Sequence, residues 1–240
     1  MMNTSVKQPE LKVADSLRQY GLALLDDLYT SEQIKSWNRL IDQHFQNTSP
    51  MERRYLNASD LLKLGIAAEV LSESLLETIN EIMPDAALYH FHFYDIPGNT
   101  QTPHIHGQNG LKGWHRDDDC FFGWEKHRFH FISFFVYLTD VKSESGPFEI
   151  APLNKDQALK NKTPTTKVLG PSGSNFIFDR TYWHRANPNL SEHNRRVIKL
   201  SFQNDYLPND RINLEEFSAL KRSHLTRSSL LKQWLMMKEA

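Results

Sequence analysis

The sequence has almost no cysteine, no excess of either charge and no long apolar run. Cys120 is the only cysteine among the 240 residues, which excludes a disulfide framework. Lys and Arg number 28 and Asp and Glu number 29, so the formal net charge at pH 7 is −1. A chain with this balance has no charge bias toward nucleic acid or an anionic membrane, and we expect neither as a partner.

The longest apolar segment, residues 131–138, is interrupted by Ser133. It is less than half of the roughly 20 residues that a membrane-spanning helix needs, and it is typical of a buried strand instead. The opening residues, MMNTSVKQPELK, have no apolar core of the kind that secretory signals carry. Together with the single cysteine, these features predict a cytoplasmic enzyme without disulfides.

The apolar residues that are present suffice for one domain. Hydrophobic residues make up 39% of the chain, and 240 residues suit one β-sandwich or barrel with flanking helices. We therefore expect a single domain over residues 1–240. Within it, residues 1–85 are expected to be mostly helical, residues 86–207 to form a jelly-roll core and residues 208–240 to form a helical segment.

Helical periodicity marks the first third of the chain. Thr30 and Gln33 form the pattern of a capping box, and apolar residues then recur at helical spacing through residues 34–45. A second helical pattern covers residues 71–83 and ends before Pro84, which cannot continue a helix. These patterns predict two helices, each with one apolar face.

From Leu88 onward the chain changes to short segments rich in aromatic and β-branched residues, separated by turn residues such as Pro97 and Gly98. Several short strands joined by irregular loops fit a double-sheet jelly roll, whose closure hides most strand edges and leaves a mouth for a site. We predict a mainly β fold with flanking α-helices and a double-stranded β-helix (jelly roll, cupin-like) core. The predicted strands are residues 88–94, 131–138, 148–151, 175–179 and 196–202.

His115 and Asp117 are the first candidate metal ligands. In an extended strand residues i and i+2 point the same way, so both side chains can reach one metal ion while Arg116 points away. The same alternation selects Asp117 over Asp118. Asp119 shares the face but lies one step further along. It is the alternative carboxylate ligand, or it orients a ligand histidine or faces solvent.

His184 is the candidate for a second ligand histidine. It follows a turn, a short apolar strand and a polar bend, and a core histidine bound to a backbone carbonyl is the alternative interpretation. His104 and His106 form a rival pair with the same alternation, but they lie in a loop-like stretch with no carboxylate between them. Two histidines and one carboxylate on one face can hold iron(II) and leave three positions open.

Arg195 and Arg196 begin a predicted strand in which successive side chains point to opposite faces. A planar guanidinium can hold both oxygens of a carboxylate, such as the far end of a 2-oxoglutarate whose near end chelates the metal. If the apolar face of the strand packs under the helices, Arg195 points to this cofactor. If the faces are reversed, Arg196 does, and periodicity leaves both options open.

Five motifs follow one another along the chain: QYGLALLDDLYTSEQI at 19–34, WHRD at 114–117, FVYLTD at 135–140, SGPFEIAP at 145–152, and DRTYWH at 179–184 followed by Pro188, Asn189, Ser191 and Arg195. In the order and spacing of these motifs, residues 16–202 resemble the phytanoyl-CoA dioxygenase family of iron(II)/2-oxoglutarate oxygenases, and the first motif resembles the opening strand and helix of that family. The turn that is Pro-Gly-Ser-His in many relatives is altered to Ala-Pro-Leu-Asn at 151–154, and two of the motifs also resemble prolyl 4-hydroxylase-like oxygenases.

The resemblance implies that His115, Asp117 and His184 bind iron(II), and it selects Arg195 over Arg196 for the 5-carboxylate of 2-oxoglutarate. It implies an enzyme that consumes O2 and 2-oxoglutarate, releases succinate and CO2, and hydroxylates a C–H bond of a small-molecule metabolite. Halogenating relatives have a small residue in place of Asp117, so the carboxylate favours hydroxylation.

Two other functions fit parts of the sequence. A cupin-like metalloenzyme that does not use 2-oxoglutarate needs the three metal ligands but not Arg195. A non-catalytic jelly-roll binding module uses the histidines only as structural residues. Because one fold serves many reactions, the fold alone does not choose among substrates such as acyl thioesters, amino acids and alkaloids.

Overall fold

The computed structural model describes residues 12–25, 28–47, 54–103, 113–117, 129–151, 164–204 and 217–237. Strands in these ranges build two antiparallel sheets. The strands are β1 (Leu22–Leu25), β2 (Tyr55–Asn57), β3 (Ala86–Ile96), β4 (Phe131–Tyr137), β5 (Phe148–Ile150), β6 (Thr166–Val168), β7 (Asn175–Asp179), β8 (His184–Ala186) and β9 (Arg195–Asn204).

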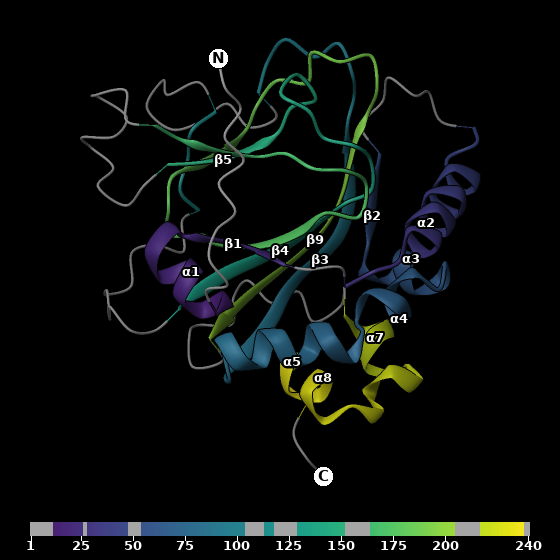
Figure 1. Cartoon of the computed structure of the whole chain (residues 1–240). Coiled ribbons are helices and arrows are strands. Elements are labelled where there is room, and N and C mark those ends of the chain that lie inside the picture. Colours follow the sequence, from purple (N-terminus) through teal and green to yellow (C-terminus); the bar gives the residue numbers. More distant parts are fainter. Residues whose placement is uncertain are drawn as a thin grey trace.

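The two sheets form a jelly roll. The larger sheet has the strand order β1-β7-β4-β9-β3-β2, and the smaller sheet has the order β6-β5-β8. Figure 1 shows β5 of the smaller sheet above the larger one, α1 at the left, and the other labelled helices below and to the right. The predicted fold class, mainly β with flanking helices and a jelly-roll core, is confirmed.

Helices come from both ends of the described chain. Each of them is too short or too polar to cross a membrane, as far as the described ranges extend. The helices are α1 (Val13–Tyr20), α2 (Ser31–His44), α3 (Ala58–Lys63), α4 (Ile66–Val70), α5 (Glu73–Ile82), α7 (Ser218–Lys221), the 3-10 helix η2 (His224–Arg227) and α8 (Ser229–Trp234).

The two helices predicted from periodicity begin and end for the expected reasons. Thr30 Oγ1 accepts from Gln33 N at 3.2 Å, and the Gln33 side chain accepts from Thr30 N at 2.9 Å, which completes the capping box of α2. Ser72 caps α5, which ends at Ile82, before Pro84. Both predicted helices are confirmed.

Two apolar clusters divide the core according to the faces of the larger sheet. The outer cluster lies under the helices and includes Trp37 of α2, Phe134 of β4 and Ile198 of β9. The inner cluster lies between the sheets and includes Phe135 of β4 and Val197 of β9. Alternate residues of one strand thus enter different cores, and the inner face is the one that faces the smaller sheet.

The part of the chain before β3 also supplies strands. β1 pairs with β7, and β2 pairs with β3, so these two strands form the opposite edges of the larger sheet. Periodicity alone indicated only helices here, because each strand is three or four residues long and shows no sustained alternation. The opening strand followed from the family resemblance.

Candidate metal centre

His115 and His184 lie next to each other at the edge of the smaller sheet. They form an antiparallel bridge in which the backbone N–H of each residue donates to the carbonyl of the other at 3.0 Å. The centroids of the two imidazole rings are 4.4 Å apart. A pair of backbone hydrogen bonds therefore joins two histidines that are far apart in the sequence.

The ring orientation of both histidines is set by backbone carbonyls. His115 Nδ1 lies 2.8 Å from the Gly113 carbonyl oxygen, and His184 Nδ1 lies 2.9 Å from the Tyr182 carbonyl oxygen. A carbonyl only accepts, so in each ring Nδ1 carries the proton and donates it. The Nε2 lone pair is left for a metal ion, as is usual for ligand histidines with such partners. A hydrogen bond to a backbone carbonyl was the alternative, structural interpretation of His184. The same hydrogen bond also fixes the tautomer that a metal-binding histidine needs.

Asp117 completes a group of three potential metal ligands. One ligand atom each from His115, Asp117 and His184 lies within 4.8 Å of the others, and the Asp117 Oδ2 to His184 Nε2 distance is 3.4 Å. It is the one such group of His, Cys, Asp or Glu side chains that the described residues contain. The structure therefore brings together the three side chains predicted from the sequence, with the two-histidine, one-carboxylate chemistry that suits iron(II).

The surroundings favour the ligand forms of these groups. Burial, assisted by the neighbouring His184, lowers the pKa of His115 and so favours its neutral imidazole. Burial acts to raise the pKa of Asp117, but the hydrogen bond and charge of His184, together with the charges of Lys199 and His115, hold this pKa well below its ordinary value. A neutral imidazole and an ionised carboxylate are the forms that bind metal.

Arg180 is a buried neighbour of this group that the sequence analysis did not identify. It follows β7 directly, and its Nε donates to Asp117 Oδ2 at 2.6 Å. Burial lowers the pKa of Arg180 to about 9. The hydrogen bond occupies one carboxylate oxygen and orients the other, the role that groups around a metal site usually have. The sequence feature that could have pointed to Arg180 is its position within the DRTYWH motif.

Replacing Arg180 by Met is expected to weaken metal binding by about 10- to 100-fold, because Asp117 then loses the group that holds its orientation. Arg180→Lys should retain part of the affinity, since it keeps a donor but not the planar fork. Equilibrium dialysis against iron(II) without oxygen measures the effect. Arg39→Met, an exposed change on α2, is the control. An unchanged affinity in a folded Arg180→Met protein would show that Arg180 does not support the metal site.

Arg195 points from the start of β9 into the space between the sheets. It is only 1% exposed, and its Nη1 donates to the Gly146 carbonyl. Its Nε and Nη2 are buried and have no hydrogen-bond partner among the described residues. These two donors share one edge of the guanidinium, where they can hold both oxygens of a carboxylate. The residue therefore fits one end of a dicarboxylate such as 2-oxoglutarate.

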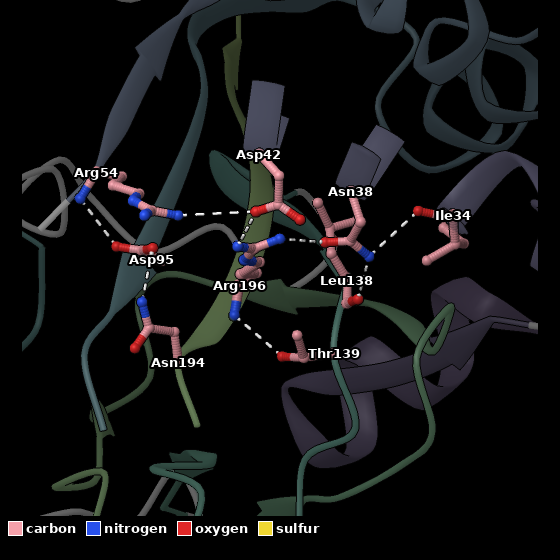
Figure 2. A network of polar contacts seen from close by, with 9 residues as sticks. All are labelled: Ile34, Asn38, Asp42, Arg54, Asp95, Leu138, Thr139, Asn194 and Arg196. Carbon is pink, nitrogen blue, oxygen red and sulfur yellow. Dashed lines mark hydrogen bonds and ion pairs between the residues drawn. The ribbon is translucent and has the colours of Figure 1, made fainter. Parts of the chain in front are cut away.

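Arg196 points the other way and is bound to helix α2. Figure 2 shows its guanidinium between Asp42, 2.5 Å from Nη2, and Asn38, whose Oδ1 accepts from Nη1 at 2.9 Å. Its backbone N–H donates to Thr139 Oγ1 at 3.1 Å. The charge of Arg196 is thus matched on the outer face, and the packing of the helices leaves Arg195 as the arginine of this pair that faces the smaller sheet.

The same network holds the end of β3 next to the start of β9. Buried Asp95 accepts from the backbone N–H of Arg54 at 2.8 Å and from Asn194 Nδ2 at 3.1 Å (Figure 2). Because Asn194 precedes Arg195 directly, this contact fixes the backbone from which Arg195 projects. The rival candidates Asp118, Asp119, His104 and His106 lie outside the described residues.

Comparison with known families gives one match. The family model for phytanoyl-CoA dioxygenase (PhyH) matches residues 17–197, a range that contains the three candidate metal ligands and Arg195. No individually curated protein is matched by sequence.

Solved structures with the same fold have low sequence identity to this chain. HygX from Streptomyces hygroscopicus, with nickel and 2-oxoglutarate bound, is 14% identical with a TM-score of 0.61 over 83% of this chain and 89% of that chain. SnoN, a non-heme alpha-ketoglutarate-dependent epimerase from nogalamycin biosynthesis, is 12% identical with a TM-score of 0.61 over 80% of this chain and 81% of that chain. AviO1 from Streptomyces viridochromogenes Tue57 is 15% identical with a TM-score of 0.62 over 82% of this chain and 95% of that chain. These likenesses establish a shared fold.

Proposed function

The chain belongs to the phytanoyl-CoA dioxygenase family, and we propose on this basis that it is an iron(II)- and 2-oxoglutarate-dependent oxygenase that hydroxylates a C–H bond of a small-molecule metabolite. One observation carries the proposal. A two-histidine, one-carboxylate group lies in the same jelly roll as a buried arginine with two donors that no described residue accepts from. A metal ion can be bound by the three ligands, and a dicarboxylate can accept hydrogen bonds from the two arginine donors.

In this proposal His115, Asp117 and His184 hold the iron, and Arg195 holds the 5-carboxylate of 2-oxoglutarate. When bound, iron(II) would let O2 oxidise 2-oxoglutarate to succinate and CO2, with one oxygen atom entering succinate and the other available to the substrate. The side chains of the protein hold the co-substrate and the metal ligands in position. Arg195 fixes the far end of the co-substrate, and the carbonyls of Gly113 and Tyr182 hold the two imidazoles in their ligand form.

Aromatic rings shield the site from water on the side of the inner core. Phe148 stacks on His184 with ring centroids 5.7 Å apart, and the centroid of Phe178 is 4.8 Å from that of His184. Both rings are buried in the cluster between the sheets. A dry surrounding of this kind strengthens the electrostatic contacts of the site and suppresses side reactions with water.

Hydroxylation is the outcome that Asp117 favours. A carboxylate in the third ligand position leaves no place for a halide, and this argues against halogenation. The similar folds include an epimerase, SnoN, so the reaction outcome needs its own test. Product analysis by mass spectrometry after turnover in 18O2 is expected to show one added oxygen atom of label. Turnover without oxygen insertion would contradict hydroxylation while leaving the oxygenase family intact.

We further propose that the chain acts as one oxygenase domain and that it works in the cytoplasm on a small molecule. Two contacts support the single domain. β1 and β2 from the N-terminal part complete the larger sheet, and Trp234 of α8 packs on Phe202 of β9 with ring centroids 4.6 Å apart. The jelly roll thus shares its core with the helices of both ends.

The first experiment adds iron(II) and 2-oxoglutarate to the protein without oxygen. A weak visible charge-transfer band, the signature of a keto acid chelated to iron(II), is the expected result. A metalloenzyme that does not use 2-oxoglutarate would bind iron(II) without this band, and a binding module would bind neither. Absence of the band at saturating concentrations would therefore reject the proposed function. Succinate release over a panel of metabolites then tests turnover.

A further inference from the structure

Lys199 is a second cation on the inner face of β9. It lies four residues after Arg195 and opposite Phe135 of β4, whose ring belongs to the core between the sheets. Since opposite residues of an antiparallel pair share a face, Lys199 also points toward the smaller sheet. Its charge acts on Asp117, one of the three candidate metal ligands, and on Arg180.

No counter-ion in the described part of the chain is paired with Lys199. Among the described residues, none forms a salt bridge or a hydrogen bond with its Nζ, and Asp117 acts on it only through its charge. Its ammonium lies 5.6 Å from the centroid of the Phe135 ring. Burial, and the charge of Arg180, lower the pKa of Lys199 to about 8. The half-buried ammonium is stabilised in its charged form when an anion binds next to it.

The carboxylates of 2-oxoglutarate already have partners in the proposed site. Arg195 takes one end and the metal ion takes the other, while Arg180 is bound to Asp117. Lys199 is therefore the cation that none of these contacts uses, and a further anionic group is what it can bind. Of the molecules that the proposed reaction brings together, the primary substrate is the one left to supply that anionic group.

Aromatic side chains form a wall beside Lys199. His92 of β3 is directly opposite Lys199, and Tyr55 of β2 is opposite Tyr94 of β3. The rings of Tyr55 and His92 are stacked with centroids 5.2 Å apart, and those of His92 and Tyr94 are 5.6 Å apart. Tyr55 is 48% exposed, so the wall reaches from the interior to the surface. Flat rings of this kind suit the body of an unsaturated or ring-containing molecule.

We propose that Lys199 and the ring wall of Tyr55 and His92 form a subsite for an organic acid, so that the primary substrate carries a carboxylate and a flat or ring-containing body. The carboxylate binds to the Lys199 ammonium, and the body lies along Tyr55 and His92. This substrate class rests on the proposed function, because the subsite is defined relative to a metal centre that holds 2-oxoglutarate.

The test uses benzoate and its neutral isostere benzamide as probes. Isothermal titration calorimetry without oxygen measures their binding to the protein loaded with iron(II) and 2-oxoglutarate. We expect saturable benzoate binding and at least about tenfold weaker binding of benzamide, because the ammonium makes a charge-assisted hydrogen bond with benzoate alone. Lys199→Met should reduce benzoate binding to the level of benzamide, and Lys199→Arg should keep the preference.

Lys167→Met is the matched control, because Lys167 is an exposed lysine on β6 and its loss should leave benzoate binding unchanged. Equal binding of the two probes, no saturable benzoate binding, or a preference that survives in Lys199→Met would each overturn the proposal. So would an affinity for 2-oxoglutarate that falls tenfold or more in Lys199→Met, since Lys199 would then serve the co-substrate. The charge-transfer band is recorded in the same samples, and its absence in the wild type rejects the proposed function itself.

Discussion

Asp117→Ala is expected to lose iron(II) binding by at least about 100-fold and, with it, succinate release. Loss of a group that only orients a ligand already weakens metal binding by about 10- to 100-fold, and Asp117 is the one carboxylate of the candidate ligand group. Asp117 also supplies the negative charge of this ligand group, so its replacement removes the charge that attracts a dication. Equilibrium dialysis against iron(II) without oxygen and succinate assays measure the two effects.

Asp119→Ala is the decisive control for this prediction, because alternation left Asp119 as the other carboxylate on the same face. If Asp117 is the ligand, the Asp119 variant should lose clearly less affinity for iron(II) than Asp117→Ala does. Full iron(II) affinity in a folded Asp117→Ala protein would remove Asp117 from the metal site.

Arg195→Met is expected to raise the Kd for 2-oxoglutarate by about 10- to 100-fold while iron(II) affinity changes little. A hydrogen bond to a charged group contributes about 1.5–3 kcal/mol, and each 1.4 kcal/mol corresponds to a tenfold change in Kd. The two donors of Arg195 that have no partner among the described residues would supply such bonds. Anaerobic titration of the charge-transfer band with 2-oxoglutarate measures the change. Arg195→Lys should recover only part of it, because an ammonium lacks the fork that holds both oxygens.

Arg196→Met is the matched control, since the two arginines are adjacent and face opposite ways. Its Kd for 2-oxoglutarate should stay within about threefold of the wild-type value. Its Tm should fall, because the guanidinium holds Asp42 and Asn38 of α2 against the sheet (Figure 2). If the affinity for 2-oxoglutarate falls in Arg196→Met and not in Arg195→Met, the assignment of the two faces to their functions is wrong.

Local patterns predicted several elements well. The capping box of Thr30 and Gln33 begins α2, and the segment at 175–179 is a strand with the predicted bounds. The strand predicted at 196–202 is longer, at 195–204, because its pairing with β3 and β4 continues past the apolar residues. Periodicity and capping act through neighbours in the sequence, and for this reason they can be read without a structure.

Other features depended on segments that meet only in the folded chain. Arg180 acquires its role from a contact with Asp117, which lies on a different segment, and no local pattern marks that contact. Lys199 shares a face with Arg195 by simple alternation, but that face becomes significant only because Asp117 and Arg180 come close to it. The bridge between His115 and His184 is likewise a long-range backbone contact.

The sequence by itself determined the fold class, the order of the candidate ligands and the partition of β9 into two faces, because side-chain alternation is a property of any extended strand. Only the tertiary structure decided which of these faces meets the helices. Ile198, Leu200 and Phe202 pack beneath them, so Arg195 and Lys199 face the space between the sheets. Burial of apolar area drives that choice, and it leaves the two cations where a metal-bound acid and an acidic substrate can bind.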